Sequence, residues 1–397
     1  MTLTHAPWRG RPGLAKLLDV LGADAGETRY VGGCIRDTLL GLEVSDVDLA
    51  TRLAPQEVLT RLEAARIKAV PTGLAHGTVT AVIQGWPVEV TTLRRDVATD
   101  GRRATIAYTE DWQEDAARRD FTINALSADP GSGEIFDYFG GLADLETRTV
   151  RFIGDPLVRI AEDHLRILRF FRFHARFGAG APDVAGTEAC AARANDLMAL
   201  SRERIADELL KLLGLPDPAP TVALMIARGI FRPVLPEITS AKRLAALVEV
   251  EHGVGIAPHP IRRLAALLPS DHEVAAAVAA RLRLSKRAAA RLVSAADSSL
   301  DEPGVMAYEI GAEEAVDRLL LAGCRDPNLP ALQTRSRPRI GISGGDLIAM
   351  GLSAGPLVAK TFQAVEREWA RSGFPEDKEA LRALARRHVD QALRSSQ

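Results

Sequence analysis

The spacing of hydrophobic positions changes well before the middle of the chain. Apolar and polar residues alternate over short runs such as Val79 to Ile83 and Val88 to Thr92, which predicts two neighbouring strands. The apolar positions from Leu14 to Leu21 predict a helix. From about Gly154 onward, apolar residues recur at helical spacing to the end of the chain. The pattern therefore predicts an α/β part followed by an all-α part.

Breaks in this pattern divide the helical part further. Pro216-Asp217-Pro218 interrupts it once, and a polar stretch with prolines runs from Asp326 to Gly341. The four parts that we expect are residues 1–150, 151–215, 216–330 and 331–397.

The composition excludes several classes of protein. The 397 residues are 47% hydrophobic and 26% charged, which excludes a disordered or fibrous chain. No apolar run approaches the ~20 residues of a membrane span, and the first residues lack the pattern of a signal peptide. The three cysteines (Cys34, Cys190 and Cys324) form no CxxC pair, so we expect neither disulfides nor a zinc site. We predict a cytoplasmic protein without membrane contact.

The net charge of −2 conceals a basic segment. Between Arg148 and Arg176, seven arginines face three acidic residues, a local balance of +4. Such a segment indicates a polyanionic partner, and an ordinary solvated helix face is the alternative.

A glycine pair marks the first candidate site. Tyr30 and Val31 predict a strand that enters a turn at Gly32 and Gly33, where the backbone can approach a phosphate closely. Arg36 follows about one helical turn later, where it can meet the phosphate charge. A plain turn is the alternative, because a diglycine alone is a weak signal.

Two carboxylates follow the glycine pair. Asp46 and Asp48 are two residues apart, so on a strand both would point to one face. Their mutual repulsion is relieved by a divalent cation, and Mg²⁺ prefers carboxylate and phosphate oxygens. Glu89, in the predicted strand from Val88 to Thr92, is a candidate third carboxylate. A loop for the aspartates and a surface charge for Glu89 are the alternatives.

Two further segments combine arginines with hydrogen-bonding side chains. In the first, Arg118 and Arg119 suit phosphate, and Asp120 and Asn124 would share a helix face and bind ribose hydroxyls. A surface ion pair is the alternative for this segment.

In the second segment, four charged residues recur every three positions and predict one side of a helix: Asp163, Arg166, Arg169 and Arg172. Asp163 can accept from an amino group and Arg166 can donate to a ring nitrogen, which would select C and A over U and G. A salt bridge between Asp163 and Arg166 is the alternative.

In their order and spacing these segments resemble the class II CCA-adding tRNA nucleotidyltransferases and the related bacterial poly(A) polymerases. The match is strong over residues 27–215 and returns in the tail. The segments that carry it are GGCIRDTLLG at 32–41, DVDL at 46–49, RRDFTINA at 118–125, EDHLRILR at 162–169 and SRERIADELLKLL at 201–213. The last resembles the motif that supports the templating helix of this family.

The resemblance implies a nucleotidyltransferase head with a small mixed sheet, followed by a helical neck, body and tail, over the four parts given above. It implies addition of C, C and A to the 3′ end of tRNA from CTP and ATP, with release of pyrophosphate. Neck, body and tail would hold the tRNA acceptor arm by shape and phosphate contacts.

The resemblance also implies a role for each candidate residue. Asp46 and Asp48 would hold two Mg²⁺ ions, and Glu89 stays a catalytic candidate from its place on the predicted strand alone. Asp163 and Arg166 would template the base, and Arg169 would reach the nucleotide. The residues expected to contact the triphosphate and ribose are Gly32, Gly33, Arg36, Asp37, Arg118, Arg119, Asp120 and Asn124.

Two features bear on the product. Residues 93–110 have the length of the flexible loop that full CCA-adding enzymes carry, and Gly101 among mixed charges fits a mobile lever. His164 stands where poly(A) polymerases usually have proline. Both favour CCA addition, with poly(A) synthesis or partial addition as the alternatives.

Some bacterial members of the resembled family carry a phosphohydrolase module that is marked by a His-Asp pair. None of the eight histidines here is followed by aspartate, so we expect no phosphohydrolase activity.

Overall fold

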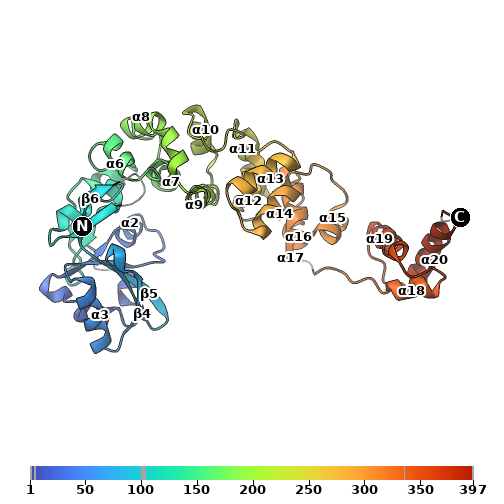
Figure 1. The fold of residues 1–397 in the computed structure, drawn as a ribbon, viewed down its shortest axis with the longest axis horizontal. Coiled ribbons are helices and arrows are strands. Elements are labelled where there is room, and N and C mark those ends of the chain that lie inside the picture. The colour runs from blue at the N-terminus through green and yellow to red at the C-terminus, as the bar shows by residue number, and fades with distance from the viewer. Residues whose placement is uncertain (1, 4–5, 100–103, 335, 396–397) are drawn as a thin grey trace. The chain divides into compact units, whose positions relative to one another are not determined.

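The structure is a computed structural model that describes residues 2–3, 6–99, 104–334 and 336–395. The chain forms two compact units, residues 1–212 with 224–236, and residues 213–223 with 237–397. Every strand of the described residues lies before residue 137, and the elements after it are helices (Figure 1). The predicted change from an α/β part to an all-α part is thus confirmed, whereas the four-part division stays a prediction.

The first unit is built on a mixed sheet. Within the described residues, its seven strands lie in the order β3-β4-β5-β2-β1-β8-β9. The strands are β1 Thr28–Val31, β2 Asp48–Thr51, β3 Lys68–Gly73, β4 Thr78–Ile83, β5 Trp86–Thr92, β8 Ser127–Ala128 and β9 Ile135–Phe136. β2 and β5 run parallel, whereas the other neighbours are antiparallel.

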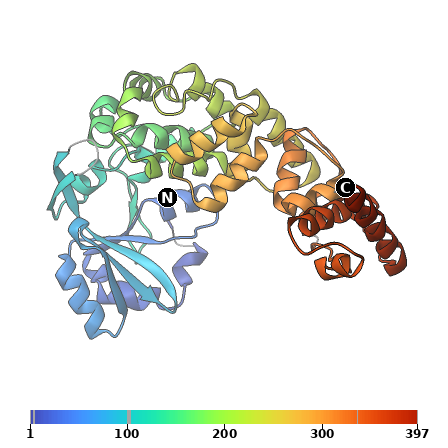
Figure 2. The ribbon, with the colours of Figure 1, turned by 45° about the vertical axis from the view of Figure 1, so that its right-hand side comes forward.

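The two strands predicted from alternating residues form the β4–β5 hairpin (Figure 2). Gln84 and Gly85 at its tip both have positive φ, at 47° and 91°, as a tight hairpin turn requires. Val79, Ala81, Val88 and Val90 are buried. The helix α3, Pro55–Ala64, contacts β3 and β4 and covers this part of the sheet.

Helices of the first unit lie both between the strands and after the last of them. They are α1 Leu14–Val20, α2 Gly33–Leu39, α3 Pro55–Ala64, α4 Trp112–Ala117, α5 Gly141–Glu146, α6 Pro156–Glu162, α7 Arg166–Phe177, α8 Val184–Ala192, α9 Arg202–Leu213 and α10 Ala219–Ala227. The division between the two units falls within α9 and α10.

An aromatic core holds α7 against the loop that follows α4. Phe152 and Phe170 stack with ring centroids 5.4 Å apart, and Phe121 packs on Phe152 at 5.1 Å and on Phe173 at 5.1 Å. All but Phe173 are fully buried. Offset and tilted aromatic pairs add about 0.5–1.5 kcal/mol each to the area that they bury. This core fixes the distance between α7 and the segment that carries Arg118, Arg119 and Asp120.

The second unit consists of helices in its described residues. They are α11 Lys242–Val254, α12 Pro260–Leu267, α13 His272–Arg281, α14 Lys286–Ala295, α15 Pro303–Ile310, α16 Ala312–Leu321, α17 Leu329–Thr334, α18 Gly344–Ala349, α19 Pro356–Arg371 and α20 Lys378–Arg394.

Charged side chains lie inside this unit and join α11, α12, α14 and α16. The buried ion cluster consists of Arg262, Arg263, Arg291, Glu251, Asp317 and, at its edge, Glu313. Arg262 reaches Glu251 at 2.6 Å and Asp317 at 3.0 Å, and Arg291 reaches Asp317 at 2.6 Å. Arg262 and Arg263 are each 1% exposed. The cluster thus ties four helices together through ion pairs.

The segment at residues 93–110 is largely regular rather than a loop. β6 Arg94–Thr99 pairs with β7 Ala104–Tyr108 in an antiparallel hairpin. The two ends of the segment expected to be a flexible loop are thus paired strands, and its role as a lever stays a prediction. Gly101 and the neighbouring Asp100, Arg102 and Arg103, on which the idea of a lever rested, lie outside the described residues.

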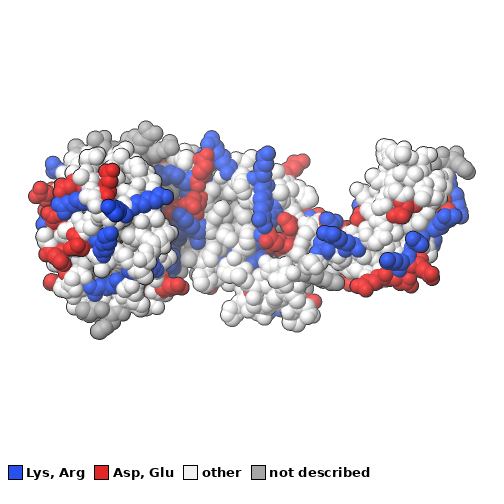
Figure 3. All heavy atoms as spheres, turned by 90° about the horizontal axis from the view of Figure 1, so that it is seen from below, with Lys and Arg blue, Asp and Glu red and all other residues white. Residues whose placement is uncertain are grey.

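Charges of both signs are interspersed over each part of the surface shown in Figure 3. This distribution agrees with the small net charge of the chain. Among the described residues, no helix is both long and apolar enough to cross a membrane.

Candidate functional site

A polar cavity of about 350 Å³ opens where β1, the segment after α4 and the start of α7 meet. It is lined by eleven residues, here called the arginine-lined cavity: Gly32, Gly33, Arg36, Arg118, Arg119, Asp120, Asn124, Asp163, Arg166, Arg169 and Phe173. These include all the residues that the sequence predicts to bind the nucleotide, except Asp37. Three distant segments of the chain are therefore brought to one cavity.

Gly32 allows the backbone to turn at the edge of this cavity. Its φ of +71° and ψ of −119° lie in a region that favours glycine. A Cβ atom there would lie 3.0 Å from Nη1 of Arg119 and 3.6 Å from the carbonyl oxygen of Asn124. A side chain at residue 32 would thus strain the turn and crowd Arg119, which explains the glycine at the end of β1.

Arg36 is already engaged inside the protein. Its guanidinium pairs with Asp37 at 2.7 Å and donates to Oδ1 of Asn124, and it lies 4.1 Å from the ring of Phe177. Burial lowers the pKa of Arg36, and the neighbouring Asp37 opposes this shift. Asp37 therefore acts on the cavity through Arg36 rather than by lining it, and a phosphate would have to compete for this arginine.

The carboxylates lie on and beside the sheet. β2 begins at Asp48, and the parallel register places Asp48 beside Glu89 of β5. Asp46 precedes the strand, is exposed and accepts from Oγ of Ser45 at 2.8 Å. The expectation that Asp46 and Asp48 share one strand is thus wrong, because the ladder starts at Asp48. The predicted neighbour relation between Asp48 and Glu89 is confirmed.

The electrostatics of Asp48 fit a divalent cation. Burial, together with the charges of Glu89 and Asp46, raises the pKa of Asp48 to about 6, against the effect of Arg119. Among the described residues, no three His, Cys, Asp or Glu side chains form a ready-made metal cluster. The carboxylates thus carry mutual repulsion without a closed ligand set.

Asp120 and Asn124 are adjacent, although no helix joins them. Helix α4 ends at Ala117, and only Thr122–Asn124 form a short 3₁₀ turn. Asn124 donates to Oδ1 of Asp120 at 2.9 Å, and Arg169 of α7 donates to Oδ2 at 2.7 Å. Burial raises the pKa of Asp120, but Arg169 and the bond from Asn124 outweigh it and keep the carboxylate ionised. The predicted proximity is right and the predicted helix is wrong.

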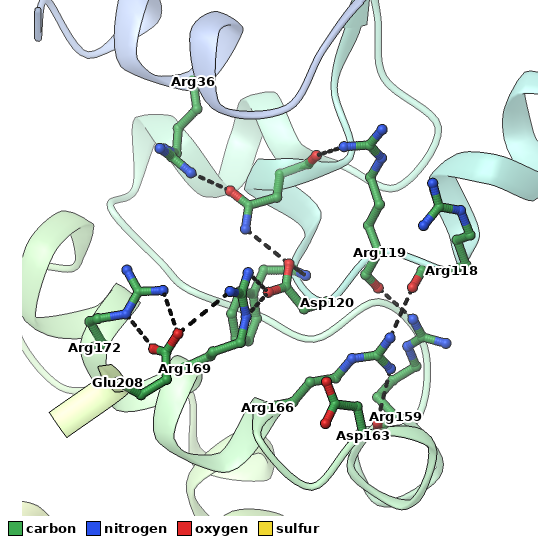
Figure 4. A network of polar contacts seen from close by, with 12 residues as sticks. Arg36, Arg118, Arg119, Asp120, Arg159, Asp163, Arg166, Arg169, Arg172 and Glu208 are labelled. Carbon is green, nitrogen blue, oxygen red and sulfur yellow. Dashed lines mark hydrogen bonds and ion pairs between the residues drawn. The ribbon is translucent and has the colours of Figure 1, made fainter. Parts of the chain in front are cut away.

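Arg118 and Arg119 are held at both ends. Their guanidinium groups pair with the buried Asp115 at 2.8 Å and 3.3 Å. Their carbonyl oxygens accept from two neck arginines, Arg166 at 2.9 Å and Arg159 at 2.5 Å, and we name these contacts the carbonyl clamp (Figure 4). The side chains of Arg118 and Arg119 therefore do form ion pairs, as the alternative stated. Their partner Asp115 is buried, however, so these are not surface pairs, and both arginines line the cavity.

Asp163 and Arg166 have separate partners. Helix α7 begins at Arg166, and Asp163 precedes it in an extended conformation, so the expected four-residue helical row starts only at Arg166. Asp163 accepts from Arg204 at 3.0 Å, whereas Arg166 pairs with Glu162 at 2.5 Å. The mutual salt bridge that we considered is thus replaced by two other pairs. Both side chains line the cavity.

Helix α9 supplies the partners that the sequence did not single out. Glu208 is 3% exposed and accepts from Arg172 at 2.5 Å, with Arg169 at 3.8 Å (Figure 4). Arg204 and Glu208 are four residues apart, so they share one face of α9. The four-residue spacing of Arg204 and Glu208 within residues 201–213 is the sequence feature that could have identified them.

Comparisons with known proteins identify the family of the chain. The chain matches the Poly A polymerase head domain over residues 28–151, and the probable RNA and SrmB-binding site of polymerase A over residues 187–242. It is 34% identical over 391 residues to the mouse (Mus musculus) mitochondrial CCA tRNA nucleotidyltransferase 1, covering 93% of this chain and 88% of the relative. It is 30% identical to the CCA-adding enzyme of Latilactobacillus sakei, covering 93% and 96%.

Solved structures share the fold. A CCA-adding enzyme of Bacillus stearothermophilus in complex with CTP superposes with a TM-score of 0.72 at 24% identity, over 97% of this chain and 100% of that chain. A Thermotoga maritima CCA-adding enzyme complexed with tRNA gives 0.67 at 20% identity, over 98% and 97%. With relatives matched along almost their whole length, the chain belongs to the family of CCA tRNA nucleotidyltransferases, the CCA-adding enzymes.

Proposed function

We propose that this protein adds C, C and A in turn to the 3′ end of tRNA, using CTP and ATP and releasing pyrophosphate. The observation that carries the proposal is the arginine-lined cavity, which joins a glycine turn, hydrogen-bonding residues and an Asp–Arg pair. Five arginines and two aspartates line it, and the forked guanidinium donors suit the oxygens of a triphosphate.

In this proposal the carboxylates hold Mg²⁺, with Asp46 and Asp48 as ligands and Glu89 beside them. The bound ions would lower the pKa of the tRNA 3′-hydroxyl and stabilise the charge on the leaving pyrophosphate. The 3′-oxygen forms a bond to the α-phosphorus, and the bond from that phosphorus to the bridging oxygen breaks. The ionised form of Asp48 is the form that binds the metal, so its proton must leave first.

The nucleotide is held by groups that the fold has already fixed. Gly32 and Gly33 present backbone to the triphosphate, and Arg118 and Arg119 supply charge. Asp120 and Asn124 meet the ribose hydroxyls. These side chains are held by one another or by buried partners, so little conformational entropy is lost when the nucleotide binds.

Base selection falls to Asp163 and Arg166. Arg204 fixes the carboxylate of Asp163, and two backbone carbonyls with Glu162 fix the guanidinium of Arg166. Asp163 would accept from the N4 amino group of cytosine or the N6 amino group of adenine, and Arg166 would donate to the ring nitrogen. A rigid acceptor and donor reject the reversed edges of U and G, because buried polar groups would then lack partners.

The tRNA acceptor arm and the cytoplasmic location are further parts of the proposal. Within the basic segment, the exposed Arg148 and Arg176 offer charge to a polyanion, which would be recognised by shape and phosphate rather than by sequence. The mouse relative is named a mitochondrial protein, so location in the cytoplasm stays a prediction.

A product ladder tests the proposed function. The purified protein receives tRNA that ends at the discriminator base, Mg²⁺, and CTP, ATP or both. We expect growth by two nucleotides with CTP and by a third when ATP is added. A stop at two with both nucleotides would indicate a CC-adding enzyme, and a long ladder from ATP alone a poly(A) polymerase. The Asp48→Ala variant serves as the control for contaminating activity.

A further inference from the structure

Asp115 lies where the β6–β7 hairpin joins the arginine-lined cavity. It sits in α4, directly after the hairpin, and is 3% exposed. Its Oδ1 accepts from the backbone amide of Arg94, the first residue of β6, at 3.2 Å. The same oxygen accepts from Nε of Arg118 at 2.9 Å, and Oδ2 accepts from Arg119 at 3.3 Å. One buried carboxylate therefore contacts the hairpin and both cavity arginines.

The charge balance around Asp115 is uneven. Burial raises its pKa, but the charges of Arg119 and Arg118 outweigh this and keep it ionised. A single carboxylate faces two guanidinium groups, and Arg94 adds a further positive charge near Arg118. The arginines therefore retain attraction for a second anion, which is what a triphosphate in the cavity would supply.

Glu114 provides a contrast one residue away. It accepts from Oγ1 of Thr109 at the end of the hairpin at 2.5 Å, and it lies 4.0 Å from Arg95. Both of these contacts, with Thr109 and Arg95, are on the hairpin side. Glu114 thus holds the hairpin without touching the cavity, whereas Asp115 does both.

We propose that Asp115 is a positioning residue that couples the root of the β6–β7 hairpin to Arg118 and Arg119. This inference rests on the proposed function, since it takes the two arginines as ligands of the triphosphate. When a triphosphate brings a second anion to Arg118 and Arg119, the two arginines share their attraction between the phosphates and Asp115, so their hold on Asp115 weakens without a change of place. The carboxylate then accepts more strongly from the Arg94 amide, so nucleotide binding stiffens the hairpin root.

Hydrogen exchange tests this coupling without tRNA and without turnover. The wild type, Asp115→Asn and Glu114→Gln are each measured with and without CTP and Mg²⁺, and calorimetry reports CTP binding separately. We expect CTP to slow exchange at the start of β6 about fivefold in the wild type and in Glu114→Gln. In Asp115→Asn, CTP still binds, but the effect falls below about twofold because the neutral amide responds weakly to the arginines.

Three results would overturn the coupling. CTP binding to the wild type without slower exchange at β6 is the first, and it needs no variant. The second is that CTP slows exchange at β6 in Asp115→Asn as much as in the wild type. The third is that Glu114→Gln loses the slowing by CTP to the same extent as Asp115→Asn. Should Asp115→Asn fail to fold, Asp115→Glu keeps the charge and must retain the CTP effect. Absence of CTP binding to the wild type would instead count against the proposed function.

Discussion

The arginine-lined cavity and the buried ion cluster are built from the same two kinds of side chain and differ in balance and access. The cavity has five arginines and two aspartates around an open volume of about 350 Å³. The buried ion cluster has three arginines and three carboxylates, and its Asp317 is 0% exposed. Every arginine of the cluster pairs with a carboxylate of the cluster.

Access to solvent separates a binding site from a structural site in this protein. In a buried cluster whose charges pair with one another, removal of one member leaves an unpaired buried charge. A cluster of arginines that lines an open cavity can also bind an anion from outside, although each arginine already has a carboxylate partner. The first kind of site should control stability and the second activity.

The largest effect should come from Asp48→Ala. We expect CMP incorporation to fall by about 10³-fold or more, ~4 kcal/mol in the barrier, because a metal ligand is lost. The melting temperature should stay equal or rise, since repulsion from Glu89 and Asp46 is relieved. Single-turnover kinetics and thermal melting check this. A clear loss of stability would assign Asp48 to the structural kind and break the comparison.

Asp317→Asn should have the reverse effect. Loss of one buried partner of Arg262 and Arg291 should lower the free energy of unfolding by about 3–5 kcal/mol. Activity of the folded fraction should be unchanged at low temperature. Arg287→Ala is the matched control, because its pair with Glu313 is exposed and worth about 1 kcal/mol or less. Denaturant unfolding is the measurement, and equal losses in both variants would contradict the prediction.

Arg204→Ala should act on selectivity. Arg204 fixes both carboxylate oxygens of Asp163, at 3.1 Å and 3.0 Å. Without it, incorporation of UMP relative to CMP should rise about tenfold, or ~1.4 kcal/mol. Competition between CTP and UTP measures this ratio. Lys211→Ala, which breaks an exposed pair on the same helix, should leave the ratio unchanged.

The smallest effect is a pH dependence. Because the pKa of Asp48 is raised to about 6, the ionised form decreases as the pH falls through that value. At low Mg²⁺ the rate should therefore fall about fourfold at pH 5.5. Because the pKa of Asp48 is raised, the folded, metal-free protein binds more protons than the unfolded chain between about pH 4 and 6. The contribution of Asp48 to the free energy of unfolding therefore increases as the pH falls through this range. Raising Mg²⁺ should move the midpoint to lower pH, and a midpoint independent of Mg²⁺ would argue against Asp48 as a ligand.

The sequence predicted which segments meet but not how their side chains pair. Alternating residues sufficed for β4 and β5, because one face of each strand is buried. The residues of the cavity were found because glycine, carboxylate and arginine types each limit the chemistry of a position. Asp46, Asp120 and Asp163 were misplaced on regular elements, since local spacing does not say where a strand or helix begins.

The partners of the arginines were beyond local reasoning. Asp115 and Glu208 look like surface residues of amphipathic helices, and only tertiary packing buries them. Glu208 lies 36 positions after Arg172, so no periodic pattern connects the two. Burial and long-range proximity decide such pairs, and a single sequence does not carry them.

The carbonyl clamp has a consequence for engineering. Arg166 donates to the carbonyl oxygen of residue 118 and Arg159 to that of residue 119. Every amino acid has this backbone oxygen. This docking is therefore blind to side-chain identity. Substitutions at positions 118 and 119 should therefore keep these two backbone contacts, although they remove the side-chain pairs with Asp115, and chimeras that exchange the catalytic segment between relatives should keep this joint intact.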